Sequence, residues 1–192
     1  MLHPETGREP SVDDFQNTLI LDPVQHLVDC HEGIEQRLKI LEGLIVDLRS
    51  GSESKRSDAR ESLAVTLDFL ETIGALHTED EEGSVFPRLL VNAGSQDPTL
   101  AELTTMLEEQ HREKETTLRK LLDCVAAFPA APDPPSEHQT RVFTGLAAQI
   151  GDLYRPHIMV ENQRLIPLLA EYLTSDDLDR IREEMLLRWK RS

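Results

Sequence analysis

Apolar residues recur every three or four positions through most of the chain, and this spacing restricts the fold more than any other feature of the sequence. It places the apolar side chains on one face of an α-helix, which can then pack on a common core. The first such segment lies between Val24 and Leu48 and contains Leu27, Cys30, Ile34, Leu38, Leu41, Ile45 and Leu48. Alternation with a period of two does not extend over any useful length. The sequence therefore predicts an all-α fold.

Three further segments have the same periodicity. The second contains Leu63, Leu67, Leu70, Ile73 and Leu76, the third runs from about Thr99 to Ala126, and the fourth covers roughly 137 to 172. The breaks between them are polar RSGSESKRSD at 49–58, NAGSQDP at 92–98 and proline-rich FPAAPDPPSE at 128–137. Four long helices joined by modest loops pack most simply in alternating directions. We therefore expect an antiparallel up-down-up-down four-helix bundle over residues 22–172.

Both ends of the chain lie outside this predicted bundle. Residues 1–21 contain Pro4 and Pro10 and are interpreted as an N-terminal arm. Residues 173–192 include SDDLDRIREEMLLRW, which predicts a short fifth helix with Ser175 as its cap. The apolar side chains of this helix could pack on the bundle or form a docking face for a protein partner; they are Met185, Leu186, Leu187 and Trp189.

The charge and composition exclude several classes of function. The 192 residues include 20 Lys and Arg against 36 Asp and Glu, a formal net charge of -16, so the chain as a whole repels nucleic acid and anionic membranes. Its apolar runs are far shorter than the roughly 20 residues that span a bilayer. The polar, acidic first residues do not resemble a signal peptide, so we expect a cytoplasmic protein. Cys30 and Cys124 lack metal-binding spacing and are expected to fill the core.

Four histidines within the helical segments are each followed, four residues later, by a glutamate. Residues at this spacing lie on one helix face, so each pair can present an imidazole and a carboxylate in the same direction. One pair alone is weak evidence, because a buried histidine is usually a satisfied core residue. The pairs are His31 with Glu35, His77 with Glu81, His111 with Glu115, and His157 with Glu161.

The four pairs form an internal repeat, because one constant offset relates the last two histidines to the first two. His111 is the equivalent of His31 (111 − 31 = 80), and His157 is the equivalent of His77 (157 − 77 = 80). The segments that follow His77 and His157 also share the pattern H-x-x-x-E-x-x-x-apolar-apolar-P-x-L. A repeat of this kind indicates two pairs of helices related by an approximate twofold axis, each supplying half of a site.

Helix lengths predict that the four histidines converge on one level of the bundle. His31 precedes Arg49, at the start of the expected loop, by the same separation at which His77 follows Ala59, at its end (49 − 31 = 77 − 59). Burying four imidazoles and several carboxylates is costly unless they are paired or bind a cation. Imidazole with carboxylate suits iron, manganese or zinc, and six or more ligands exceed the needs of one tetrahedral zinc ion. Two carboxylate-bridged iron ions are the favoured prediction.

At these positions the sequence resembles the hemerythrin-like family, also called the HHE cation-binding domain, over about residues 22–172. The resemblance implies a four-helix bundle that holds an oxo- or hydroxo-bridged pair of non-haem iron ions, with Glu81 and Glu161 as bridges. The implied metal ligands are His31, His77, Glu81, His111, His157 and Glu161. Glu35 and Glu115 have no counterpart in the family, and three roles stay open for them: metal ligand, hydrogen-bond acceptor for a ligating imidazole, or solvent-facing residue.

Oxygen-carrying members of that family have H-x-x-x-H on the third helix and H-x-x-x-x-D on the fourth. This chain has H-x-x-x-E at both places, so reversible oxygen carriage is not expected. It is closer to bacterial di-iron proteins of nitric-oxide stress and iron-sulphur repair. The favoured function is binding or reduction of oxygen, peroxide or nitric oxide, with or without catalytic turnover. The alternatives are a metal- or redox-responsive regulatory protein and a structural zinc bundle.

Overall fold

The computed structural model describes residues 12, 20–94, 96–130 and 133–191. Within them every regular element is helical, which confirms the all-α prediction. Most of the predicted N-terminal arm, residues 1–11 and 13–19, lies outside the described part. Among the described helices, none combines the length and the apolar character that crossing a membrane requires.

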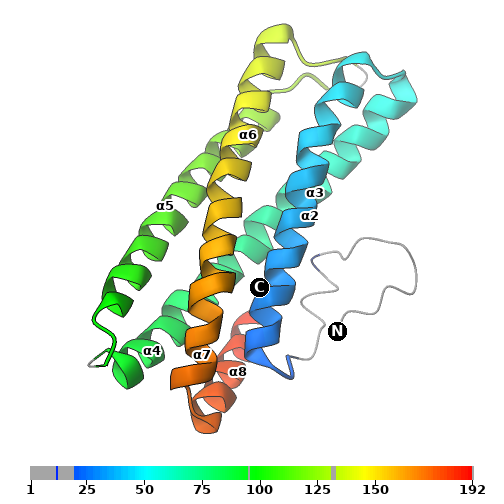
Figure 1. Ribbon diagram of the computed structural model, residues 1–192. Coiled ribbons are helices and arrows are strands. Elements are labelled where there is room, and N and C mark those ends of the chain that lie inside the picture. Colours follow the sequence, from blue (N-terminus) through cyan, green and yellow to red (C-terminus); the bar gives the residue numbers. More distant parts are fainter. Residues whose placement is uncertain (1–11, 13–19, 95, 131–132, 192) are drawn as a thin grey trace.

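Four long helical segments lie side by side and enclose the core (Figure 1). The first two are α2 (Pro23–Ser50) and α3 (Glu53–Asp80), and the third is α5 (Thr99–Ala126), with the predicted bounds. The fourth begins with α6 (Glu137–Val160). Helix α2 packs against both α3 and α6, and α5 packs against α6. Leucine and isoleucine side chains fill the space between them, for example Leu41, Leu70, Leu107, Leu121 and Ile150, all fully buried.

The break predicted at residues 49–58 was too long. Helix α2 continues to Ser50, and Ser52 caps α3 by accepting a hydrogen bond from the backbone of Lys55. Residues 53–58 are mostly exposed and have no apolar position, so the helix they form leaves no periodic signal. His31 is then closer to the end of α2 (50 − 31) than His77 is to the start of α3 (77 − 53), so the predicted equality was wrong. The two helices are inclined to each other (Figure 1), and their histidines meet despite the unequal lengths, with the two Nε2 atoms 3.1 Å apart.

A wide π-helical turn interrupts the second and the fourth segments at equivalent places. The turns are η1 (Glu81–Val85), followed by α4 (Phe86–Ala93), and η2 (Glu161–Leu165), followed by α7 (Ile166–Tyr172). In each, the backbone N–H after the turn bonds five residues back, from Phe86 to Glu81 and from Ile166 to Glu161. The next residue is proline, which has no N–H to continue an ordinary helical ladder. Such turns are frequent at functional sites, and each begins at a glutamate of the repeat.

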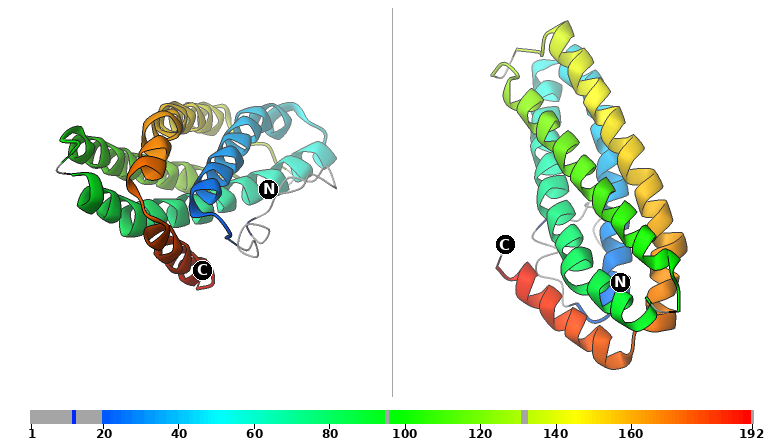
Figure 2. Two further views of the ribbon diagram at one scale, coloured as in Figure 1. Left: turned by 60° about the horizontal axis from the view of Figure 1, so that its bottom comes forward. Right: turned by 90° about the vertical axis from the view of Figure 1, so that its left-hand side faces the viewer.

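The C-terminal helix α8 (Ser175–Trp189) has the predicted length and crosses one end of the bundle (Figure 2). Its cap is Thr174 rather than Ser175, because Thr174 and Asp177 exchange hydrogen bonds as a capping box. Met185 and Trp189 are buried against the bundle, whereas Leu187 is exposed. Packing is therefore the main use of this apolar face.

Hydrogen bonds and ion pairs connect α8 to the region of the turn at Glu81. The buried carboxylate of Asp80 accepts hydrogen bonds from the Arg188 guanidinium and, at 2.7 Å, from Nε1 of Trp189. Glu184 accepts from Ser84 at 2.6 Å and pairs with Arg88. Burial raises the pKa of Asp80 to about 6, against the lowering effect of Trp189 and Arg188. The last helix is thus connected to the residue that directly precedes Glu81.

Candidate metal centre

The six residues implied as ligands come together in the interior. They lie on four separate helical segments, two of them at the start of the π-helical turns, and none exposes more than 4% of its surface. They are His31 on α2, His77 on α3, Glu81 in η1, His111 on α5, His157 on α6 and Glu161 in η2. Each wide turn begins at one of the two carboxylates.

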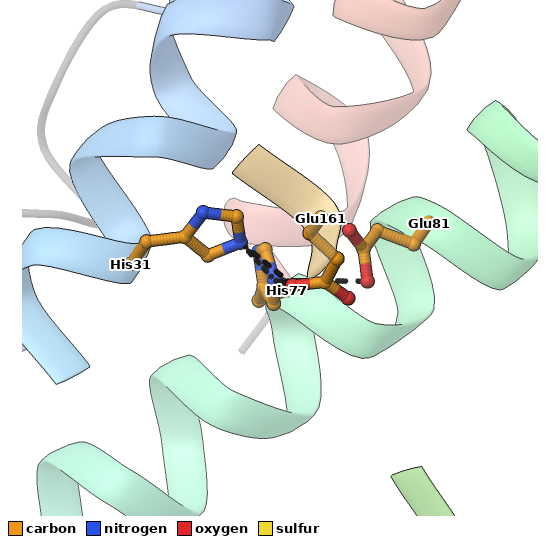
Figure 3. A group of neighbouring side chains, drawn as sticks. All are labelled: His31, His77, Glu81 and Glu161. Carbon is orange, nitrogen blue, oxygen red and sulfur yellow. Dashed lines mark hydrogen bonds and ion pairs between the residues drawn. The ribbon is translucent and has the colours of Figure 1, made fainter. Parts of the chain in front are cut away.

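One group of four consists of His31, His77, Glu81 and Glu161, whose side chains point toward one another (Figure 3). Nε2 of His31 lies 3.0 Å from Oε2 of Glu161 and 3.1 Å from Nε2 of His77. Nε2 of His77 lies 3.6 Å from Oε2 of Glu81. One donor atom from each residue fits within a common separation of 4.8 Å, so the four can surround a single ion.

The second group contains the same two glutamates with His111 and His157. Nε2 of His157 lies 2.6 Å from Oε1 of Glu161, and Nε2 of His111 lies 3.2 Å from Oε2 of Glu81. The two groups therefore share both carboxylates and differ in their histidines. A carboxylate has two oxygens and can bind one ion with each.

In three of the histidines, the Nδ1 atom is hydrogen-bonded to a side-chain oxygen of a residue outside the six. Nδ1 of His31 donates to Oδ1 of Asn162 at 2.8 Å, and Nδ1 of His111 donates to Oε1 of Glu82 at 2.7 Å. Nδ1 of His157 donates to Oε1 of Gln110 at 2.8 Å. In the neutral form, an imidazole held in this way keeps its proton on Nδ1 and directs the lone pair of Nε2 at the other ligands, which is the tautomer a metal-binding imidazole needs.

The sequence reasoning missed these three acceptors, although the repeat contained a signal for two of them. Glu82 and Asn162 occupy equivalent positions of the repeat (162 − 82 = 80), so each follows a glutamate of the repeat and binds a histidine of the other half. The symmetry fails at Gln110, whose equivalent is Cys30. Among the described residues, Nδ1 of His77 has no hydrogen-bond partner.

The pKa values of the clustered carboxylates and imidazoles are shifted in different directions. Burial, with the charge of Glu161, raises the pKa of Glu81 to about 7. Burial also acts to raise the pKa of Glu161, but close contacts with the histidines, His111 first, hold it well below its usual range. Burial lowers the pKa of His77 to about 3 and that of His157 to about 4. Burial also acts to lower the pKa of His111. Close contacts with Glu161 and Glu81 outweigh burial and raise this pKa to about 9.

The inward-facing atoms fit a bound cation better than they fit one another. Both oxygens of Glu81 and Glu161, and Nε2 of His111 and His157, are buried without an aligned hydrogen-bond partner in the described part of the chain. Each unpaired buried polar atom costs about 1–3 kcal/mol. Oxygen and nitrogen lone pairs that converge at these distances can all be satisfied by cations.

Lys114 and Tyr154 lie beside the second group. Lys114 exposes 3% of its surface, and its Nζ stands 4.6 Å from the centre of the Tyr154 ring. Burial lowers the pKa of Lys114 to about 8, against the charges of Glu161, Glu81 and Glu82. A cavity of about 410 Å³ between α3 and α5 is lined by both residues and by His111.

The two remaining glutamates of the repeat lie outside both groups. Glu35 is half-buried, and Glu115 is exposed and pairs with Arg119 at 2.5 Å. His26 is buried but packs edge-on against Trp189, with ring centres 4.6 Å apart. Burial lowers its pKa to about 4, against the charge of Asp29.

A comparison with protein families matches residues 22–169, or 148 of the 192 residues, to the hemerythrin HHE cation-binding domain. The matched region contains all six clustered residues and ends in α7. No curated protein and no solved structure matches the chain significantly.

Proposed function

The chain belongs to the hemerythrin HHE cation-binding family, and we propose that it holds two iron ions within the His and Glu cluster. The supporting observation is that two groups of four potential ligands share both carboxylates, Glu81 and Glu161. A single ion would need only one group. Two ions side by side use all six residues and bring both negative charges next to both cations.

The ligands divide between the two positions. His31 and His77 would hold one ion, His111 and His157 would hold the other, and both ions would share Glu81 and Glu161 and an oxo or hydroxo group. Glu82, Asn162 and Gln110 orient three of the imidazoles through Nδ1. We also interpret residues 22–172 as an antiparallel up-down-up-down four-helix domain, preceded by an arm at 1–21 and followed by the helix in 173–192.

Iron is favoured over zinc by the number and type of ligands. Each ion has two imidazoles and two shared carboxylates within reach, and six-coordinate iron retains positions for a small exogenous ligand. A pair of iron ions supplies electrons and these open positions. The chain itself buries all six side chains and orients three of the imidazoles. Manganese fits the same ligands, and elemental analysis separates the metals.

The proposed activity is binding or reduction of oxygen, peroxide or nitric oxide, in a cytoplasmic response to oxidative or nitrosative stress. The two H-x-x-x-E pairs at His111 and His157 support reduction over oxygen carriage, because they differ from the third- and fourth-helix motifs of the oxygen carriers. Carboxylate bridges from Glu81 and Glu161 favour the more oxidised states of iron.

Metal analysis combined with absorption spectroscopy tests this proposal. Protein loaded with iron under anaerobic conditions and then oxidised should contain two iron ions per chain and absorb near the ultraviolet edge. Azide or peroxide should change that absorption. Iron-loaded protein that responds to neither ligand would contradict the proposal, and a zinc content that excludes iron would favour a structural site.

A second candidate function is a metal- or redox-responsive regulatory protein that acts through α8. The observation that favours it is the binding of Asp80, next to Glu81, by Arg188 and Trp189. Loading the cluster could then change the attachment of α8 and a protein surface that includes exposed Leu187. Hydrogen exchange of residues 175–189 should slow on iron binding, and equal exchange with and without iron would refute this function.

A further inference from the structure

Lys114 is a buried lysine whose charge the proposed di-iron centre does not use. It follows His111 by one helical turn and exposes 3% of its surface, and its Nζ lies 4.6 Å from the centre of the Tyr154 ring. An ammonium group in the interior is costly unless a partner compensates it. The aromatic ring supplies part of that compensation through a cation-π contact.

Once the cluster binds metal, Glu81 and Glu161 cannot compensate the rest of the Lys114 charge. In the diferric state two ions would bring six positive charges, whereas Glu81, Glu161 and Glu82 together with an oxo bridge would supply at most five negative charges. The interior around Lys114 then has an excess of positive charge. A small anion close to Nζ would reduce this excess, and the protein offers a space for one.

That space is the cavity of about 410 Å³ between α3 and α5. Its inner wall includes His111, Lys114 and Tyr154, all buried, so it reaches the half of the cluster that contains His111 and His157. Gly74 also lines it, and a Cβ atom there would lie 2.8 Å from the Tyr154 hydroxyl. The absence of a side chain at residue 74 therefore keeps room for the tyrosine beside Lys114.

The cavity is also lined by other glutamates and arginines. All of those in the described part of the chain are exposed. Two of them, Glu115 and Arg119, form an ion pair with each other at 2.5 Å. Water screens such groups, so they influence a small ligand in the interior less than Lys114 does. Among the lysine, arginine and carboxylate side chains described along the cavity wall, Lys114 is the buried one.

We propose that this cavity binds a small inorganic monoanion, such as azide or deprotonated peroxide, with Nζ of Lys114 as its hydrogen-bond donor and counter-charge. The anion lies between Lys114 and the metal position of His111 and His157. This inference rests on the proposed di-iron function and specifies which ligands that function prefers: anions over neutral diatomic molecules.

The test compares Lys114→Met with Lys120→Met in the iron-loaded full chain. Lys120 is an exposed lysine of the same helix and provides a matched control for loss of charge. Azide is titrated into the diferric protein by absorption, and nitric oxide into the diferrous protein. A hydrogen bond to a charged group contributes about 1.5–3 kcal/mol, so K114M should weaken azide binding at least about tenfold. Nitric-oxide affinity, and both affinities of K120M, should stay within about twofold of wild type.

Iron content is measured first, because it separates a failure of the di-iron proposal from a failure of the Lys114 proposal. Wild-type protein that takes up no iron refutes the di-iron function and, with it, this ligand site. K114M that holds two iron ions and binds azide as wild type does overturns the Lys114 site alone, as does an equal loss for azide and nitric oxide. If K114M loses iron, a crystal structure of wild-type protein with azide decides: azide in contact with Nζ supports the site, and azide elsewhere overturns it.

Discussion

Replacing Glu82 with alanine removes the oxygen that holds His111 in its orientation, without touching any of the six clustered residues. The hydrogen bond from Nδ1 of His111 to Oε1 of Glu82 is 2.7 Å long and joins an imidazole to a carboxylate. It fixes the tautomer and makes Nε2 a stronger donor to a cation. Its loss should therefore weaken metal binding rather than unfold the chain.

The magnitude follows from the type of hydrogen bond and its exposure. Removing a hydrogen-bond partner of this kind lowers metal affinity about 10- to 100-fold. The Glu82 side chain is 38% exposed, so water can replace part of the lost bond in the variant. We therefore expect a loss of about tenfold, or about 1.4 kcal/mol, for one of the two ions.

Competition with a chromophoric iron chelator under anaerobic conditions measures this loss. Exposed Glu113, two residues after His111, provides the control, and Glu113→Ala should match wild type. An unchanged iron affinity in Glu82→Ala would refute the reasoning about orientation. So would an equal loss in the control, because a general effect of negative charge would then explain both.

Three further predictions concern other parts of the molecule. Glu161→Gln should lower the iron content from two per chain to none, because both groups share this carboxylate, whereas His31→Ala should retain one ion; elemental analysis distinguishes these results. Because burial lowers the folded-state pKa of His26 to about 4, wild-type stability should fall by on the order of a few kcal/mol as the pH falls from about 6.5 to 4, and this slope should be shallower in His26→Gln. Arg188→Met should cost about 3 kcal/mol of unfolding free energy in denaturant titrations, because it leaves the carboxylate of Asp80 buried without its guanidinium partner.

Controls accompany each of these variants. Exposed His138 provides the matched control, and a slope equally shallow in His26→Gln and His138→Gln would argue against His26. Arg182 pairs with exposed Asp179 at 3.2 Å, so Arg182→Met should change stability by less than about 1 kcal/mol. A cost as large as that of Arg188→Met would contradict the role of Asp80. Iron bound to Glu161→Gln would show that the shared carboxylate is dispensable.

Periodicity and the internal repeat predicted the parts of the structure that depend on regular spacing. Helix α5 and the length of α8 follow directly from apolar residues on one helix face. The repeat predicted that His31, His77, His111 and His157 lie in one site. In the structure they lie in two adjacent groups that share both carboxylates. Membership of the hemerythrin HHE family was predicted from the same residues and confirmed.

The features that were missed leave no signal in the spacing of the apolar residues. The start of α3 has only polar residues before Ala59, so an exposed helix and a loop have the same pattern there. The π-helical turns add one residue to a helical turn, and only the prolines at 87 and 167 indicate them. The offset of the repeat relates Glu82 to Asn162 (162 − 82 = 80), but it does not indicate that each side chain contacts a histidine of the other half, because that contact depends on tertiary structure.

Anomalous scattering at the iron edge, from crystals of the iron-loaded protein, tests the central claim most directly. The account predicts two peaks per chain, about 3.5–4 Å apart. One should lie among His31, His77, Glu81 and Glu161, and the other among Glu81, His111, His157 and Glu161. A single peak, or peaks away from Glu81 and Glu161, would contradict a carboxylate-bridged di-iron centre.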